Sequence, residues 1–187
     1  MPDAPITLKQ RTLLCENAVF TVYSDHVRDE AGGEVRDYLA IVPRNRTAEK
    51  MSGVAVLPVL EGRYGLICVY RHPLGEFCWE VPRGFIDAAE SPVAAALREL
   101  KEETGLVPGE PLLPLGMIAP EPGVLDAKVG LFAAPHCVRS GSASGGEMGH
   151  RELKFFTRDE LVALIDKGRI LDPCTLVAIL KYLNLRT

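Results

Sequence analysis

The sequence predicts an α/β protein in which helices cover a mixed β-sheet, with an antiparallel β-hairpin region at the N-terminal end. Three observations predict this class. Apolar, β-rich runs occur in both halves of the chain, a strongly helical stretch lies between strands in the middle, and two helical stretches end the sequence. The expected organisation is an N-terminal β-strand region at 1–50 and a main domain at 51–187, forming one structural unit.

Residues 11–50 carry the signals of antiparallel strands. VFTVYSDHV is rich in β-formers, AGGE supplies a turn around Gly32 and Gly33, and VRDYLAIV resumes the strand pattern, so a hairpin is expected. Its polar groups are expected to be ordinary surface side chains, namely Asp25, His26 and Asp37.

The remaining strands and helices follow from short apolar runs and their end signals. Strands are expected at GVAVLPVL, LICVYR, LGMIA, KVGLFAA and LKFFT. DELVALIDKG predicts a helix that ends at Gly168, and Asp172 with Pro173 predicts the start of a last helix, CTLVAILKYLNL. Both helices are expected to pack on the sheet.

The stretch 84–106, GFIDAAESPVAAALRELKEETGL, constrains the chemistry most. Ser91 can cap a helix, Pro92 suits its first position, and Gly105 supplies the stop signal. At about 100° per residue this helix has two faces. The apolar face, which we expect to be buried, holds Val93, Ala96, Leu97 and Leu100.

The opposite face of this predicted helix gathers three carboxylates, Glu99, Glu102 and Glu103. Like charges at this spacing cost a few tenths of a kcal/mol per pair on an isolated helix. A hard divalent cation such as Mg²⁺ or Mn²⁺ would compensate, because it prefers carboxylate oxygens and can bridge to substrate phosphates. A solvated acidic helix face is the alternative.

The whole string resembles the Nudix box, Gly-x5-Glu-x7-Arg-Glu-U-x-Glu-Glu-x-Gly-U, where U is a bulky aliphatic residue, and every specified position fits. The resemblance implies the Nudix fold, an α/β/α sandwich that holds two or three Mg²⁺ or Mn²⁺ ions and hydrolyses nucleoside diphosphate derivatives. Carried over by position, it implies metal ligands at Glu99, Glu102 and Glu103, with catalytic roles for Glu102 and Glu103. Arg98 would orient these carboxylates, and Glu90 would be a supporting charge.

The flanks of the box are similar to the ADP-ribose pyrophosphatase branch of this family. VYRHP and WEVPRGFID carry the likeness, which implies substrate contacts from Arg71, Trp79 and Glu80. Arg71 could pair bidentately with a phosphate or make an ordinary surface ion pair. The residue before the box glycine often gives a metal its backbone carbonyl in this branch, and Arg83 stands here where Ala is common.

Two further segments resemble this branch. Ala119-Pro120-Glu121-Pro122-Gly123 looks like its downstream Pro-Gly segment, so Glu121 could contact substrate or be a solvent-facing turn residue. RSGSASGGEMGHRE predicts a mobile loop, where the resemblance implies a glutamate acting on the attacking water. Glu147 is the first candidate for this catalytic role, followed by Glu152 and His150, and a plain linker is the alternative.

The resemblance implies that the chain cleaves ADP-ribose to AMP and ribose 5-phosphate. The alternatives are another nucleotide sugar, a dinucleotide or an oxidised nucleoside triphosphate, and, from a different class, a sensor that binds ADP-ribose without cleaving it. In this branch the N-terminal strands commonly take part in a homodimer, which is therefore expected here.

Composition sets the remaining limits. With 47% hydrophobic and 25% charged residues, the chain has an ordinary globular composition, and its net charge of −4 argues against polymeric nucleic acid as a partner. The five cysteines are scattered without a C-x-x-C pair, so reduced thiols are expected. The start MPDAPITLKQ lacks a signal-sequence core and no apolar run is long enough to span a membrane, so we expect a cytoplasmic protein.

Overall fold

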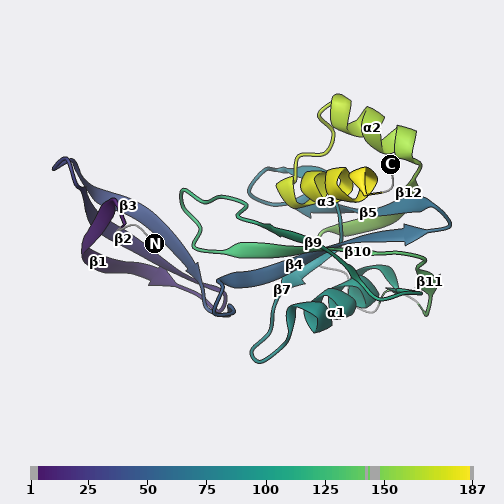
Figure 1. The fold of residues 1–187 in the computed structure, drawn as a ribbon, viewed down its shortest axis with the longest axis horizontal. Coiled ribbons are helices and arrows are strands. Elements are labelled where there is room, and N and C mark those ends of the chain that lie inside the picture. The colour runs from purple at the N-terminus through teal and green to yellow at the C-terminus, as the bar shows by residue number, and fades with distance from the viewer. Residues whose placement is uncertain (1–3, 142, 144–147, 186–187) are drawn as a thin grey trace.

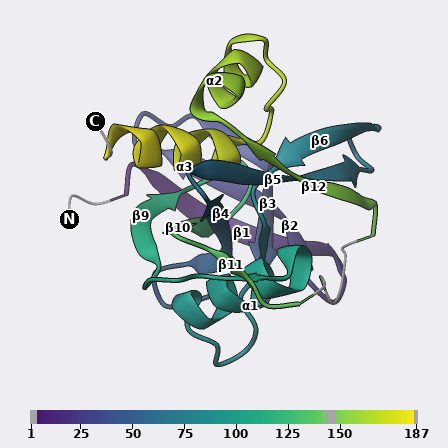
Figure 2. The ribbon, with the colours of Figure 1, turned by 90° about the vertical axis from the view of Figure 1, so that its right-hand side faces the viewer.

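A computed structural model describes residues 4–141, 143 and 148–185 of the chain. Its main body has three layers, with α2 (Arg158–Asp166) and α3 (Pro173–Asn184) on one face of a mixed sheet and α1 (Pro92–Thr104) on the other (Figure 1). The view at right angles shows the same layering (Figure 2). The predicted α/β/α sandwich is therefore confirmed.

The central sheet has the strand order β12-β5-β4-β10-β9, with β6 paired to β5 and β7 paired to β4. β4 and β10 run parallel, whereas the other pairs in this sheet are antiparallel. The strands are β4 (Met51–Leu60), β5 (Arg63–Arg71), β6 (Glu76–Glu80), β7 (Arg83–Phe85), β9 (Leu113–Ile118), β10 (Lys128–Ala134) and β12 (His150–Phe156). Two short strands, β8 (Leu106–Val107) and β11 (Val138–Arg139), pair separately.

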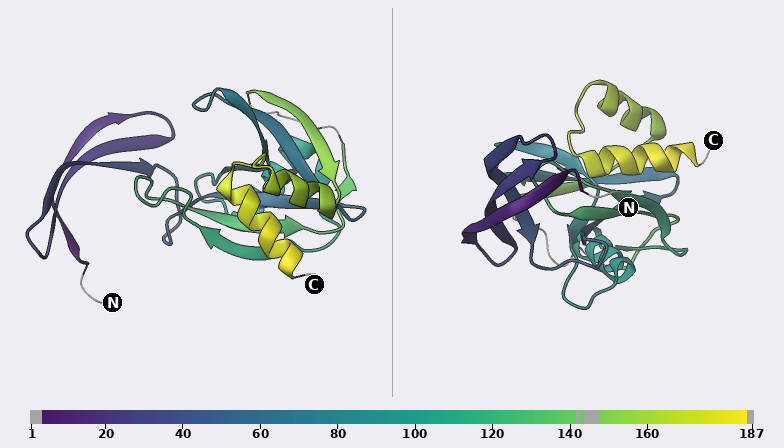
Figure 3. Two further views of the ribbon diagram at one scale, coloured as in Figure 1. Left: turned by 90° about the horizontal axis from the view of Figure 1, so that it is seen from above. Right: turned by 60° about the vertical axis from the view of Figure 1, so that its left-hand side comes forward.

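The N-terminal region is a separate antiparallel sheet of β1 (Ile6–Glu16), β2 (Phe20–Asp29) and β3 (Glu34–Pro43). It stands apart from the main body in Figure 1 and arches away from it in Figure 3. The predicted hairpin is β2–β3, and β1 adds a strand that the hairpin prediction did not contain. The pairing of β1 with β2 is interrupted by two register shifts, which break the alternation that marks a strand in sequence.

The predicted caps at Ser91, Gly105 and Asp172 are present, and α2 has a further cap that was not predicted. The Ser91 hydroxyl accepts a hydrogen bond from the Ala94 N–H at 3.2 Å, and Gly105 ends α1 in the left-handed conformation, with φ of 68°. Thr157 forms a capping box with Glu160 at α2. Asp172 caps α3, as predicted.

The alternation of side chains along β4 builds two cores, one on each face of the sheet. Ala55, Leu57 and Val59 pack toward α2 and α3, whereas Val54 and Val56 pack toward α1. Each face of the sheet is therefore closed by its own helical layer. This arrangement holds α1, and with it the predicted carboxylates, against β4 and β7.

The buried face of α1 differs from the prediction. Val93 and Leu97 are 48% and 39% exposed, whereas Glu99 and Glu103 are 9% and 4% exposed. The prediction that Val93 and Leu97 are buried is wrong, although Ala96 and Leu100 are buried as expected. Periodicity shows which side chains share a face, but the position of the sheet decides which face is covered.

Asp25 of the N-terminal sheet also differs from the prediction. The expectation that Asp25 is an ordinary surface group is wrong, because it is 5% exposed and pairs with Arg11 at 2.6 Å. All five cysteines are free thiols, as expected. Across the described ranges, no helix combines the length and apolar character needed to cross a membrane.

Candidate active site

Two carboxylates of α1, Glu99 and Glu103, lie against the backbone of β7. The Arg83 N–H donates to Glu103 Oε2 at 2.9 Å. A Cβ atom built on Gly84 would overlap the carboxyl group of Glu99. The first glycine of the box is therefore required by the close approach of Glu99, because any larger residue would displace this carboxylate.

Arg98 connects the other charges of the box. Its Nε and Nη2 donate to the two oxygens of Glu90 at 3.0 Å each, and Nη2 also donates to the Phe85 carbonyl at 2.9 Å. Its Nη1 lies 2.6 Å from Glu99 Oε1 and 3.3 Å from Glu102 Oε2. One guanidinium thus holds three carboxylates and the loop before the helix in fixed relative positions.

Electrostatics separate these carboxylates. Burial raises the pKa of the Glu99 carboxyl above its ordinary range, against the opposing effect of its hydrogen bond from Arg98. The hydrogen bonds from Arg98 lower the pKa of Glu90. Glu90 therefore serves as a lasting counter-charge to Arg98, while Glu99 is a buried group whose charged form gains from a further cation.

The donor set suits a hard divalent ion. Within the described residues, no three His, Cys, Asp or Glu side chains are arranged to hold an ion by themselves. Mg²⁺, however, is usually bound through one or two carboxylates together with waters and substrate phosphates. Glu99, Glu102 and Glu103 supply only oxygen donors, so they fit an ion completed by substrate.

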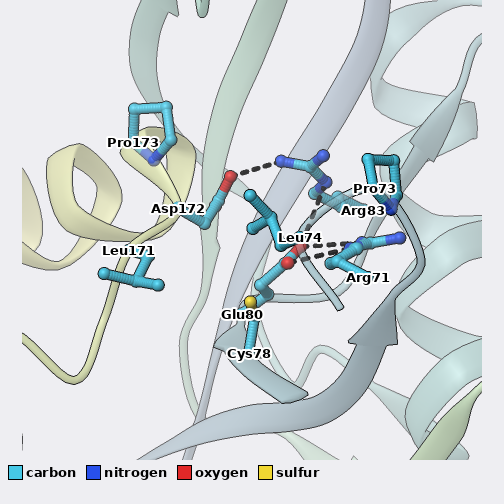
Figure 4. Close-up of a pocket in the computed structure, with 9 residues that line it drawn as sticks. All are labelled: Arg71, Pro73, Leu74, Cys78, Glu80, Arg83, Leu171, Asp172 and Pro173. Carbon is cyan, nitrogen blue, oxygen red and sulfur yellow. Dashed lines mark hydrogen bonds and ion pairs between the residues drawn. The ribbon is translucent and has the colours of Figure 1, made fainter. Parts of the chain in front are cut away.

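A cavity of about 270 Å³ opens on the other side of Arg83 (Figure 4). Its polar floor is an alternating row of charges, in which Arg71 donates to both oxygens of Glu80 at 2.8 and 2.7 Å. Arg83 Nε lies 3.4 Å from Glu80, and Arg83 Nη1 donates to Asp172. The apolar rim consists of Pro73, Leu74, Leu171 and Pro173.

Two neighbouring residues of β6 that the sequence assigned to substrate face opposite sides. Glu80 lies in the floor of this first cavity, whereas Trp79 lines a second cavity of about 340 Å³ beside α2 and packs edge-on against Phe156 at 5.2 Å. Strand alternation explains the difference. Arg71, Glu80 and Arg83 are therefore brought together by the fold, and Trp79 is not.

The loop candidates lie elsewhere. Glu121 is exposed in the turn before β10, where its carbonyl accepts the N–H groups of Val124 and Leu125, and it lines neither cavity. Glu152 is exposed in β12. His150 is partly buried there, and its Nε2 has no hydrogen-bond partner within the described residues. Glu147 lies outside the described residues.

Sequence reasoning missed the role of the segment before α3. Asp172 was predicted only as a helix cap, yet it also pairs with Arg83, 89 positions away. Thr175 accepts a hydrogen bond from the Val81 N–H at 2.9 Å. The sequence shows an arginine next to the box with Glu80 as a local partner, but nothing near it indicates a second partner in the segment before α3.

Fold and box geometry together define a Nudix-type site, and comparison with known proteins agrees. The family model described as NUDIX domain matches residues 49–174. The chain therefore belongs to the Nudix family, whose hydrolases generally use divalent metal ions.

Individual proteins share between about a third and two fifths of their residues with this chain over the aligned segments. The chain is 32% identical to an ADP-ribose pyrophosphatase of Bacillus subtilis over 71% of its own length and 72% of that protein. It is 34% identical to a methanol dehydrogenase activator of Bacillus methanolicus over the same shares. It is 42% identical to a mouse ADP-sugar pyrophosphatase, but over only 39% of this chain and 36% of that protein.

A solved structure titled "Crystal structure of ADP compounds hydrolase" is similar in fold. It matches with a TM-score of 0.80 at 20% sequence identity, covering 97% of this chain and 94% of that one. The N-terminal sheet therefore belongs to the shared architecture, since the match extends well beyond the NUDIX domain.

Proposed function

We propose that the chain hydrolyses the pyrophosphate bond of a nucleoside diphosphate derivative, with ADP-ribose as substrate and AMP and ribose 5-phosphate as products. The carrying observation is the position of Arg83. Its backbone meets the box carboxylate Glu103, and its side chain, with Arg71, forms the floor of the adjoining cavity. Two relatives named as ADP-ribose or ADP-sugar pyrophosphatases support the choice of substrate.

The residues divide the work between charge and alignment. A divalent ion, Mg²⁺ or Mn²⁺, would neutralise the pyrophosphate oxygens and lower the pKa of an attacking water. Glu99, Glu102 and Glu103 would hold two to three such ions, with the Arg83 carbonyl as a further ligand. Arg98 keeps Glu99 and Glu102 oriented, and Arg71 would bind the substrate beside Glu80. Glu147 is proposed to accept the proton of the water, and Glu121 and Trp79 to contact the substrate.

The test is a screen of nucleoside diphosphate derivatives with each metal, following release of the monophosphate. AMP from ADP-ribose is the expected result. Cleavage of another nucleotide sugar, a dinucleotide or an oxidised nucleoside triphosphate in its place would overturn the choice of substrate. Binding of ADP-ribose without any release would instead show a sensor.

Glu103→Gln tests the metal-binding role. Because the amide keeps an oxygen for the Arg83 N–H but loses the charge, we expect turnover to fall about 10²- to 10³-fold with the unfolding midpoint nearly unchanged. Glu61→Gln, at an exposed turn glutamate, is the matched control and should keep full activity. Near wild-type turnover of Glu103→Gln at saturating metal would refute the assignment.

We also propose that the protein is a homodimer formed through the N-terminal sheet and that it works in the cytoplasm. Every residue of β1 is exposed, including Ile6, Leu8, Leu13 and Leu14. Exposed apolar side chains gathered on one sheet are typical of a protein–protein contact surface. The free thiols suit a reducing compartment.

A further inference from the structure

Arg83 contacts one part of the site through its backbone and another through its side chain. Its backbone N–H donates to Glu103 Oε2 at 2.9 Å, on the α1 side of β7. Its guanidinium points the other way, into the first cavity (Figure 4). Any restraint on the guanidinium therefore also restrains the peptide group that contacts a metal-binding carboxylate.

The guanidinium is held between two buried carboxylates. Nη1 donates to Asp172, which is 8% exposed, and Nε lies 3.4 Å from Glu80, which is 3% exposed. Burial by itself lowers the pKa of Arg83, but the charges of Asp172 and Glu80 outweigh it and the net pKa is raised. Arg83 therefore stays charged and bound in place.

Asp172 is in turn fixed by the start of α3. Its Oδ2 accepts the Thr175 N–H at 2.7 Å and the Thr175 hydroxyl at 2.6 Å, while the Thr175 Oγ1 accepts the Val81 N–H at 2.9 Å. The segment 81–83 is thus attached to α3 at both ends. On its other side, the Pro82 carbonyl accepts the Val56 N–H at 2.9 Å.

A helix cap alone does not explain this arrangement. Capping uses Oδ2 of Asp172 and would work as well at an exposed position. Oδ1 binds Arg83 in a partly buried ion pair. Ion pairs withdrawn from water give little net stability against apolar replacements. The arrangement thus points to a role in geometry, and residues that orient metal ligands from outside are known to alter metal affinity.

We propose that Asp172 is a positioning residue for Glu103, acting through Arg83, so that the start of the last helix forms part of the metal centre. The inference rests on the proposed function only in requiring that Glu103 binds a divalent ion. It is independent of which nucleotide derivative is cleaved.

Titration of the full chain with Mn²⁺ alone, followed by electron paramagnetic resonance of the free ion, tests this. Asp172→Asn keeps the helix cap but removes the charge, and we expect Mn²⁺ affinity to fall about 10-fold. Arg83→Ala should have a similar effect, and the double variant Arg83→Ala/Asp172→Asn should bind no more weakly than either single variant. Asp25→Asn, at the partly buried pair with Arg11, is the matched control and should bind as wild type.

The outcomes separate this inference from the proposed function. Wild-type Mn²⁺ affinity in folded Asp172→Asn would overturn it, as would independent, additive losses in the double variant. If Asp172→Asn does not fold, the double variant, which leaves no unpaired charge at this pair, decides in its place by the same affinity criterion. Failure of the wild type to cleave ADP-ribose, with the Mn²⁺ effects intact, would sink only the proposed substrate.

Discussion

β1 of the N-terminal sheet and β4 of the central sheet are of similar length, 11 and 10 residues, but differ in what covers them. β4 is buried along nearly its whole length between two helical layers, whereas no residue of β1 is buried. The central sheet is stabilised mainly by its own packing. Among the described residues no helix covers the N-terminal sheet, so we expect it to draw stability from its attachment to the main body and from the proposed partner.

The attachment is specific but small. Ile41 in β3 exchanges backbone hydrogen bonds with Val124 and Asp126, at 2.8 and 2.9 Å. The Tyr38 hydroxyl donates to the Gly123 carbonyl at 2.9 Å, and Phe20 meets Phe85 edge-on at 5.6 Å. The turn that holds Glu121 is therefore fixed by the N-terminal sheet, and Phe20 reaches Phe85 at the end of β7.

The same substitution in each region gives the sharpest contrast. Leu131→Ala removes a fully buried side chain from the core and should lower the free energy of unfolding by about 2–5 kcal/mol. Leu13→Ala, at a position 54% exposed in β1, should change it by less than about 0.5 kcal/mol. Urea denaturation at low protein concentration measures both. Equal losses would show that the N-terminal sheet is packed like a core.

A charge in β1 tests whether a second copy covers this sheet. Leu13→Glu places a carboxylate among its exposed apolar side chains and should weaken a dimer about 100-fold, because burying one leucine contributes roughly 1.5–3 kcal/mol. Light scattering across a concentration series measures the mass. Gln10→Glu adds the same charge at a polar position of β1 and should dissociate the dimer less. A wild type that stays monomeric at every concentration would contradict the proposal.

The two regions also differ in how far the sequence predicts them. The sequence predicted α1 and its capping residues correctly, because these are local features of one helix. It did not predict that Glu99 and Glu103 would face the sheet while Val93 and Leu97 face solvent, since this depends on where β4 and β7 lie.

Side-chain pairs between distant parts of the chain could not be predicted for the same reason. Nothing local in the sequence indicates that Arg83 meets Asp172, because the contact exists only once α3 packs on the sheet. In the N-terminal sheet, β1 was not predicted as a strand, and its pairing with β2 has two register shifts. Asp25 was predicted to be a surface residue because its partner Arg11 lies on this strand. Spacing within an element is readable from sequence, whereas partners between elements are not.

The smallest predicted effect concerns the link between the two regions. Asp126 lies after the turn of Glu121 and binds Arg46 at 2.5 Å and Lys50 at 2.6 Å, both in the segment that joins β3 to β4. Burial by itself raises the pKa of Asp126, but the hydrogen bonds from Lys50 and Arg46 outweigh it, so the net pKa is lowered. The folded state therefore favours the charged carboxylate more than the unfolded state does.

The stability that Asp126 contributes depends on pH. A lowered pKa contributes stability above the ordinary value of 3.8, and this contribution is lost as pH falls through the lower folded value. Asp126→Asn should thus be less stable than wild type at pH 7 by at most about 1 kcal/mol, since these side chains are partly exposed. The difference should shrink below pH 3.8, measured by urea denaturation at both pH values, with the exposed Asp37→Asn as control. If the difference in the free energy of unfolding stays constant below pH 3.8, Asp126 contributes through its hydrogen bonds and packing and not through its charge.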